Sequence, residues 1–107
     1  MNDQDLARKR NDIARLFRHS SKIHRNCIRC NPSNTREHER EKFECCLNLL
    51  IAGKEFLTEA EFEGGQGRAD IVCLDEGVVY EIVQTESVES IEAKRKVYPL
   101  PIVVVKA

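Results

Sequence analysis

Two acidic residues interrupt apolar segments on either side of a short turn. Asp70 stands in the run Ala69–Leu74, and Glu81 stands in the run Val78–Val83. Because residues 75–77 (Asp-Glu-Gly) are typical of a hairpin turn, the two runs should pair as antiparallel strands and bring both carboxylates onto one face. Carboxylates this close repel each other unless they are protonated, paired with a cation or bound to a metal.

Two kinds of partner could balance the charges of Asp70 and Glu81. Carboxylate oxygens bind hard divalent ions such as Mg²⁺ or Mn²⁺, which also take water and substrate phosphate as ligands. The alternative is a structural ion pair with Arg68 or Lys94. The spacing of the residues leaves both interpretations open.

The elements that must position these residues follow from the hydrophobic periodicity. It predicts a basic helix over 4–19, a helix over 36–52 ended by Gly53, strands over 56–62, 69–74 and 78–83, a helix over 87–98 stopped by Pro99, and a strand over 100–105. The segment 26–35 is rich in turn residues and reads as a linker.

The same periodicity predicts which side chains are buried. On helix 36–52, the stripe expected to face the core consists of Phe43, Cys46, Leu47, Leu50 and Ile51. Strand 56–62 alternates Phe, Thr and Ala with glutamates, as a half-buried strand does, which places Glu59 on the outer face. The apolar run 100–105 is typical of a strand buried on both faces.

The 107 residues fit one domain, but their charges are unevenly distributed. Residues 1–30 carry eight Lys or Arg against three Asp, whereas residues 31–107 carry nine basic and fifteen acidic residues. We therefore expect a basic helical arm with a Cys-containing linker over 1–35 and a core over 36–107. Such an arm suits a polyanion; the alternative is a solvated basic helix. Its candidate nucleic-acid-binding residues are Arg8, Lys9, Arg10, Arg15, Arg18, Lys22 and Arg25, joined by Arg68 of the core.

The five cysteines include one pair with metal-ligand spacing, Cys27 and Cys30. No second pair of this kind completes a four-ligand Zn²⁺ site, so reduced free thiols are the default expectation and zinc at this pair is the alternative. No stretch approaches the ~20 apolar residues of a membrane span, and the first residues lack the apolar segment of a signal peptide. We expect an intracellular protein, cytoplasmic or nucleoid-associated, with no membrane partner.

The predicted αβββαβ order combines with two short motifs, Gly67–Asp70 (Gly-Arg-Ala-Asp) and Tyr80–Val83 (Tyr-Glu-Ile-Val). In this combination residues 36–107, about two thirds of the chain, resemble the PD-(D/E)XK nuclease superfamily. The spacing from helix 36–52 through Gly53 is similar to that of archaeal Holliday-junction resolvases. The resemblance implies an α/β, restriction-endonuclease-like core with a central four-stranded mixed sheet flanked by helices, to which the N-terminal basic helix is added.

The resemblance also implies roles for individual residues. Asp70 and Glu81 correspond to the acidic metal ligands, and the backbone carbonyl of Ile82 would be a further ligand of Mg²⁺ or Mn²⁺. For the glutamate of the first core helix we choose Glu44, because Leu47 and Ile51 follow on its side of the helix. The alternatives at this position are Glu41 and Glu37.

The chain departs from the superfamily pattern at Val83, where the motif has a lysine. Lys94 on the following helix could supply the missing charge from a migrated position. Strand alternation points Gln84 away from Glu81, so Gln84 could substitute only after a local bulge. The third explanation is that the site is inactive.

These observations predict a metal-dependent nuclease that hydrolyses phosphodiester bonds, with DNA as the expected nucleic acid. The alternative is a catalytically inactive nuclease-fold module for nucleic-acid binding or assembly, with or without zinc at Cys27 and Cys30. Small nucleases of this superfamily often act as dimers, so a homodimer is also expected.

Overall fold

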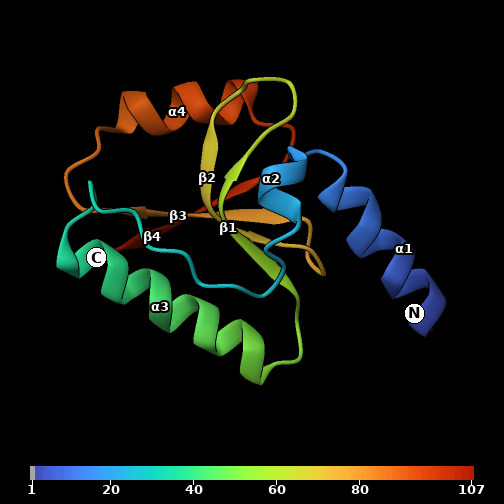
Figure 1. Ribbon diagram of the computed structural model, residues 1–107. Coiled ribbons are helices and arrows are strands. Elements are labelled where there is room, and N and C mark those ends of the chain that lie inside the picture. Colours follow the sequence, from blue (N-terminus) through green and yellow to red (C-terminus); the bar gives the residue numbers. More distant parts are fainter. Residues whose placement is uncertain (1) are drawn as a thin grey trace.

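A computed structural model describes residues 2–107 and contains one four-stranded mixed sheet between helices (Figure 1). Strands lie in the order β1-β2-β3-β4; the β1/β2 and β2/β3 pairs are antiparallel and the β3/β4 pair is parallel. The elements are α1 (Asp3–Ala14), α2 (His19–Lys22), α3 (Arg36–Ile51), β1 (Phe56–Glu61), β2 (Arg68–Cys73), β3 (Val78–Val83), α4 (Val88–Val97) and β4 (Ile102–Lys106). The predicted α/β class with a four-stranded mixed sheet is confirmed. The short helix α2 was not predicted.

Local signals in the sequence fix where the helices begin and end. The side chains of Asn2, Thr35 and Ser87 cap the first turns of α1, α3 and α4 by accepting hydrogen bonds from backbone amides. Gly53 adopts a φ of 73°, a left-handed conformation that suits glycine and ends α3. None of the helices formed by residues 2–107 has the length and apolar character that crossing a membrane requires.

The two faces of the sheet carry separate hydrophobic cores. Helix α3 covers one face, where Cys46 and Leu49 pack with Phe56, Ile71 and Ile82. The other face is covered by α4 and by the N-terminal segment, and Figure 1 shows α3 and α4 on opposite sides of the sheet. This sandwich of helices around a sheet is a common way to bury both faces.

The N-terminal segment is part of the body rather than a separate arm. Phe17 is fully buried and stacks on Phe62, with ring centroids 4.5 Å apart. Its backbone also forms a β-bridge with Phe62, which extends the edge of the sheet beyond β1. Ala14 and Phe17 belong to the same hydrophobic core as Leu57 and Tyr98, so this part of the N-terminal segment packs against the sheet.

Helix α3 buries Cys46 as predicted, but the rest of its buried face differs from the predicted stripe. Ile51 is 77% exposed, and Phe43 and Leu50 are exposed as well. The buried residues are Lys42, Cys46 and Leu49, spaced as one helical face. On this face the buried Lys42 pairs with Glu39 and Glu59, which compensate its charge.

Two strand predictions are also wrong. Strand β1 is buried on both sides, and Glu59 lies inside instead of on an outer face. Glu59 adopts a φ of 48°, which breaks the regular alternation of side chains along the strand. Strand β4 is an edge strand that pairs only with β3, so Val103 is exposed although its run is apolar.

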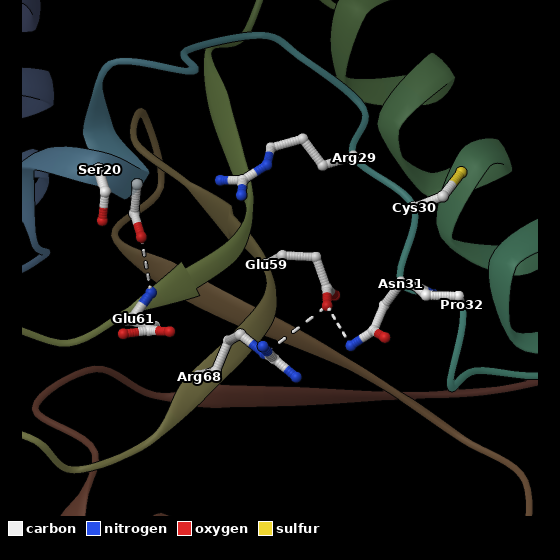
Figure 2. Close-up of a pocket in the computed structure, with 9 residues that line it drawn as sticks. Ser20, Arg29, Cys30, Asn31, Pro32, Glu59, Glu61 and Arg68 are labelled. Carbon is white, nitrogen blue, oxygen red and sulfur yellow. Dashed lines mark hydrogen bonds and ion pairs between the residues drawn. The ribbon is translucent and has the colours of Figure 1, made fainter.

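The linker before α3 is held against β1 by side-chain hydrogen bonds. The amide of Arg29 donates to Thr58 Oγ1 over 2.9 Å, and Asn31 Nδ2 donates to Glu59 Oε1 over 2.9 Å. Figure 2 shows residues 29–32 passing between β1 and α3. The linker therefore contributes residues to two pockets, one lined by residues 29–32 and one by residues 33–35.

Candidate functional site

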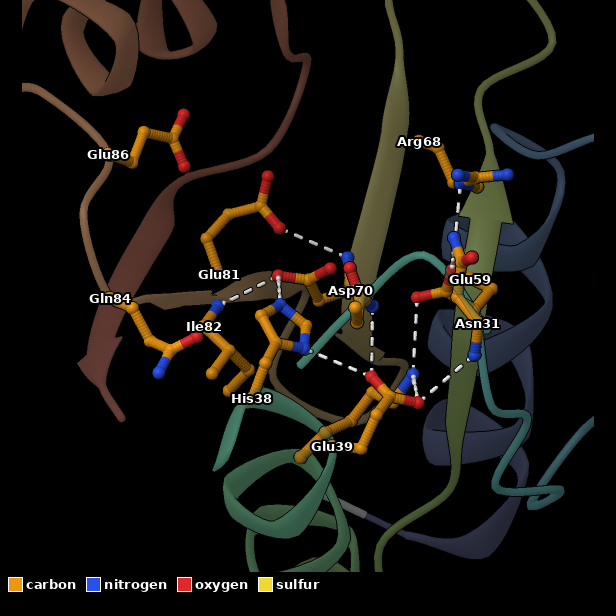
Figure 3. A network of polar contacts seen from close by, with 12 residues as sticks. Asn31, His38, Glu39, Glu59, Arg68, Asp70, Glu81, Ile82, Gln84 and Glu86 are labelled. Atoms are coloured by element: carbon orange, nitrogen blue, oxygen red, sulfur yellow. Dashed lines mark hydrogen bonds and ion pairs between the residues drawn. The ribbon is translucent and has the colours of Figure 1, made fainter. Parts of the chain in front are cut away.

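Asp70 and Glu81 lie together where the pairing of β2 with β3 ends. Ile71 and Tyr80 form the last registered pair, and the next opposed residues are Asp70 and Glu81. Glu81 Oε2 accepts a hydrogen bond from the Asp70 amide over 3.0 Å, and Asp70 Oδ2 accepts one from the Ile82 amide over 2.8 Å (Figure 3). The two carboxylates thus replace backbone bonds of the ladder, and the backbone fixes their positions. The hairpin brings both residues together as the sequence predicts.

Glu81 is the more buried of the two carboxylates, with a side chain 2% exposed. Burial, followed by the neighbouring charge of Asp70, raises the pKa of Glu81 to about 7. Oε1 accepts a hydrogen bond from the Tyr98 hydroxyl over 3.3 Å. Burial and the charge of Glu81 raise the pKa of Tyr98, so its hydroxyl remains a donor. This buried acid therefore favours a proton or a nearby cation.

We expect the free energy of unfolding of the wild-type protein in EDTA to decrease with rising pH, relative to that of Glu81→Gln. The raised pKa means that the folded protein binds more protons than the unfolded chain between about 4.5 and 7. The stabilisation by protonated Glu81 is complete below pH 4.5 and is lost as the pH rises through 7. Urea unfolding of both proteins at pH 5 and pH 8 measures this effect. The same difference in unfolding free energy between wild type and Glu81→Gln at both pH values would contradict it.

Lys94 on α4 reaches the carboxylate pair. Its Nζ lies 3.3 Å from Glu81 Oε1 and 2.8 Å from Glu86 Oε2. Burial lowers the pKa of Lys94, but the hydrogen bonds and charges of Glu86 and Glu81 outweigh this and raise it, so the amine stays charged. The structure thus brings the Lys94 amine beside Glu81. Glu86, which the sequence did not single out, shares it.

Helix α3 contributes an imidazole and a carboxylate to the same site. His38 Nε2 lies 3.4 Å from Asp70 Oδ2, and His38 Nδ1 lies 3.0 Å from Glu39 Oε1. Although burial alone would raise the pKa of Glu39, hydrogen bonds led by that of Lys42 lower it to about 2. Glu39 is therefore ionised and orients the ring of His38 toward Asp70 (Figure 3).

Glu44, the glutamate chosen from the sequence, does not lie with these residues. Its side chain is exposed, and so is that of Glu37. The choice followed Leu47 and Ile51, which do not form the buried face. On a helix, residues 4, 7 and 8 positions apart lie on the same face. The residues that share the face of Cys46 toward the start of α3 are therefore Lys42, Glu39 and His38. This signal was outweighed by the greater number of apolar residues on the exposed stripe.

The site opens into a pocket of about 350 Å³. Gln84 lines it and is hydrogen-bonded to Thr35, although strand alternation had pointed Gln84 elsewhere. The reason is that β3 ends at Val83, so alternation no longer applies to the next residue. The complete lining consists of Ser33, Asn34, Thr35, His38, Asp70, Ile82, Val83, Gln84, Thr85, Glu86 and Lys94.

Several residues expected to bind nucleic acid are instead engaged in ion pairs with the body. Arg10 donates two hydrogen bonds to the Asp75 carboxylate, over 2.8 and 2.9 Å. Arg25 pairs with Glu55 at 3.0 Å, and Arg18 pairs with Glu61 at 3.1 Å. These contacts fasten the N-terminal segment to the sheet. The remaining predicted residues are partly or fully exposed, namely Arg8, Lys9, Arg15, Lys22 and Arg68. Three of them also contact acids: Arg15 pairs with Asp12 at 2.9 Å, Arg68 with Glu59 at 3.6 Å and Arg8 with Asp5 at 4.0 Å.

Cys27 and Cys30 are both exposed and carry free thiols. Within residues 2–107, no three or more His, Cys, Asp or Glu side chains gather as a metal site would require. This holds for the Cys27–Cys30 pair and for the Asp70–Glu81 pair alike. An ion at either place would need backbone, water or substrate oxygens to complete its coordination.

Comparison with known proteins gives no independent assignment. No family model matches the chain, and no curated protein and no solved structure is significantly similar to it.

Proposed function

We propose that this protein is a metal-dependent nuclease with a restriction-endonuclease-like fold of the PD-(D/E)XK type, and that it hydrolyses phosphodiester bonds of DNA. The observation that carries this proposal is the pair Asp70 and Glu81, held by backbone amides at the end of two strands with Lys94 beside it. A pair of carboxylates and a lysine around an open pocket suits phosphoryl chemistry.

The donor set fits a hard divalent cation in part. Asp70 Oδ2 is engaged, whereas no donor within residues 2–107 binds Asp70 Oδ1, and no buried side-chain oxygen there lacks a partner, so Oδ1 is open to solvent. Both oxygens of Glu81 already have partners, the Asp70 amide at Oε2 and Tyr98 and Lys94 at Oε1, so Glu81 fits a metal ion less well than Asp70 does. Burial raises the pKa of Glu81, so a nearby cation would stabilise its ionised form. Asp70 and Glu81 would hold Mg²⁺ or Mn²⁺, with the Ile82 carbonyl, water and phosphate oxygens as further ligands. The bound ion would stabilise negative charge on the phosphate.

The other residues of the site have roles that follow from their positions. Lys94 would neutralise charge that develops on the phosphate oxygens. His38 lines the pocket with Nδ1 on Glu39 and Nε2 beside Asp70, so its ring would hold Asp70 in position next to a bound phosphate. Tyr98 would hold Glu81 in place through its hydroxyl.

A second candidate function is a nucleic-acid-binding or assembly module with an inactive site. Two observations favour it: Val83 occupies the lysine position of the motif, and Lys94 is already paired with Glu81 and Glu86. A lysine that is held by two carboxylates is less available to a phosphate.

A cleavage assay separates the two candidates. Labelled linear duplex, single-stranded and four-way-junction DNA are incubated with the protein in Mg²⁺, in Mn²⁺ and in EDTA. Cleavage that requires the metal ion supports the nuclease. Binding without cleavage on every substrate contradicts the nuclease and favours the inactive module.

We expect Lys94→Met to lower the cleavage rate by about a hundredfold, because a preorganised charge beside the phosphate is lost. Lys94→Arg should retain part of the activity, since it keeps the charge. Lys96→Met is the matched control, because Lys96 lies exposed on the same helix. Single-turnover rates at saturating protein measure the effect. Equal rates for Lys94→Met and wild type would show that Lys94 serves only as a structural ion pair.

A further inference from the structure

A second polar pocket, of about 290 Å³, lies on the other side of the linker from the Asp70 site. Its walls come from α2, the linker, β1 and β2, and they bring the guanidinium groups of Arg29 and Arg68 to one cavity (Figure 2). Ser20 adds an exposed hydroxyl at the rim. Two arginines and a hydroxyl form the donor set that phosphate groups prefer in proteins.

The acidic residues of this pocket already have partners. Glu59 contacts Lys42 at 3.3 Å, Arg68 at 3.6 Å and Asn31 at 2.9 Å, and Glu61 pairs with Arg18 at 3.1 Å. By contrast, no carboxylate in the part of the chain that the structure describes pairs with Arg29, and Figure 2 draws no contact from its side chain. The half-buried charge of Arg29 is therefore available to an anion.

The backbone of Glu59 explains why its carboxylate does not neutralise Arg29. At a φ of 48°, Glu59 adopts a left-handed conformation that is unfavourable for a non-glycine residue. The conformation turns its carboxylate to Lys42 and Asn31, which hold it by the contacts given above. The strain thus accompanies an arrangement that leaves Arg29 without an acidic partner.

The two pockets are adjacent along the chain. Linker residues 29–32 line the arginine pocket, and residues 33–35 line the Asp70 pocket. On β2, Arg68 precedes Asp70 by two residues, so the same strand also reaches both. A nucleic acid strand carries a phosphate on every nucleotide, so one strand would present neighbouring phosphates to the two adjacent pockets.

We propose that Arg29, Arg68 and Ser20 bind a backbone phosphate that neighbours the phosphate held at Asp70 and Glu81. This inference rests on the proposed function for the identity of the ligand. The phosphate in this pocket does not react; it positions the strand and contributes affinity without reading the base sequence.

The first test measures binding in EDTA, where no cleavage can contribute. Fluorescence anisotropy follows labelled duplex and junction DNA binding to wild type, Arg29→Gln and Arg40→Gln over a series of salt concentrations. Arg40 is the control because it is an exposed arginine of α3 outside both pockets. We expect Arg29→Gln to bind about tenfold more weakly. For Arg29→Gln, the slope of log affinity against log salt concentration should be less steep than for wild type by about 0.9, the value expected for the loss of one phosphate contact.

Equal affinities and slopes for Arg29→Gln and Arg40→Gln, with wild type still binding DNA, would overturn the phosphate pocket and leave the nuclease proposal intact. The second test titrates inorganic phosphate into the wild-type protein and follows the arginine side-chain Nε–H signals by NMR. Saturable shifts for Arg29 and Arg68 support the pocket even if the protein binds no DNA, in which case the nuclease proposal alone fails. Absence of shifts at millimolar phosphate contradicts the pocket.

Discussion

Asp70→Ala is expected to lower the rate of metal-dependent DNA cleavage by about a thousandfold or more while leaving DNA binding in EDTA intact. The substitution removes a carboxylate that has one free oxygen at the pocket, and it also removes the acceptor of the Ile82 amide. Without this ligand, a divalent ion would have only Glu81 as an acidic partner. Loss of such a charge from a preorganised site is among the largest single effects in catalysis.

Asp70→Asn separates the charge of this residue from its structural part. The amide oxygen can still accept from the Ile82 amide, so the ends of β2 and β3 keep their geometry, whereas the negative charge is gone. We expect a loss similar to that of Asp70→Ala. Glu44→Gln is the matched control, because Glu44 is an exposed acid of α3. This variant should cleave DNA at the wild-type rate. Cleavage by Asp70→Asn at the wild-type rate would contradict the metal-binding role.

The part of the site that lies on the hairpin could be predicted from the sequence. Asp70 and Glu81 interrupt apolar runs that flank a glycine turn, and a short antiparallel hairpin leaves little freedom in its register. The pairing of these carboxylates therefore follows from local signals. The reach of Lys94 to Glu81 was a weaker inference, because it depends on how α4 packs over the sheet.

The part of the site that lies on α3 could not be predicted, because the buried face of this helix includes a lysine that apolar periodicity does not place inside. Apolar content favours the stripe of Phe43 and Ile51, yet the helix buries Lys42 instead. When the core-facing side of a helix is predicted from the spacing of apolar residues, a lysine on one face argues against burial of that face. The partners that permit its burial, Glu39 and Glu59, are separated from one another by twenty residues and meet only in the fold. Glu59 itself was assigned to the outer face, because alternation cannot foresee a positive φ.

Lys42→Met is expected to lower the free energy of unfolding by about 3–5 kcal/mol, the usual cost of removing one partner from a buried ion pair. The side chain of Lys42 is 1% exposed, and its Nζ lies 2.9 Å from Glu39 Oε2 and 3.3 Å from Glu59 Oε2. Methionine matches the length of the lysine stem, so packing is largely preserved while two carboxylates lose their shared cation. Urea unfolding at pH 7 measures the difference.

Lys54→Met is the matched control for the loss of a lysine–glutamate pair. Lys54 contacts Glu76 at 3.0 Å, but both side chains are about one third exposed, so we expect a much smaller loss than for Lys42→Met. Adding Glu59→Gln to Lys42→Met should recover part of the stability, because it removes one of the two unpaired charges. Equal losses for Lys42→Met and Lys54→Met would contradict the importance of the buried pair.

The dependence of this loss on pH identifies its cause. In wild type the pKa of Glu39 is lowered from its ordinary value of 4.5 to about 2. Ionised Glu39 therefore contributes its full stabilisation at pH values above 4.5, and this contribution is lost as the pH falls through 2. Without Lys42, the hydrogen bond that lowers the pKa of Glu39 most is lost and burial still opposes its charge, so its pKa would rise and protonation would relieve the variant. The difference between wild type and Lys42→Met should therefore shrink as the pH is lowered from 7 to 3. A difference that stays constant would assign the loss to packing, because packing does not titrate.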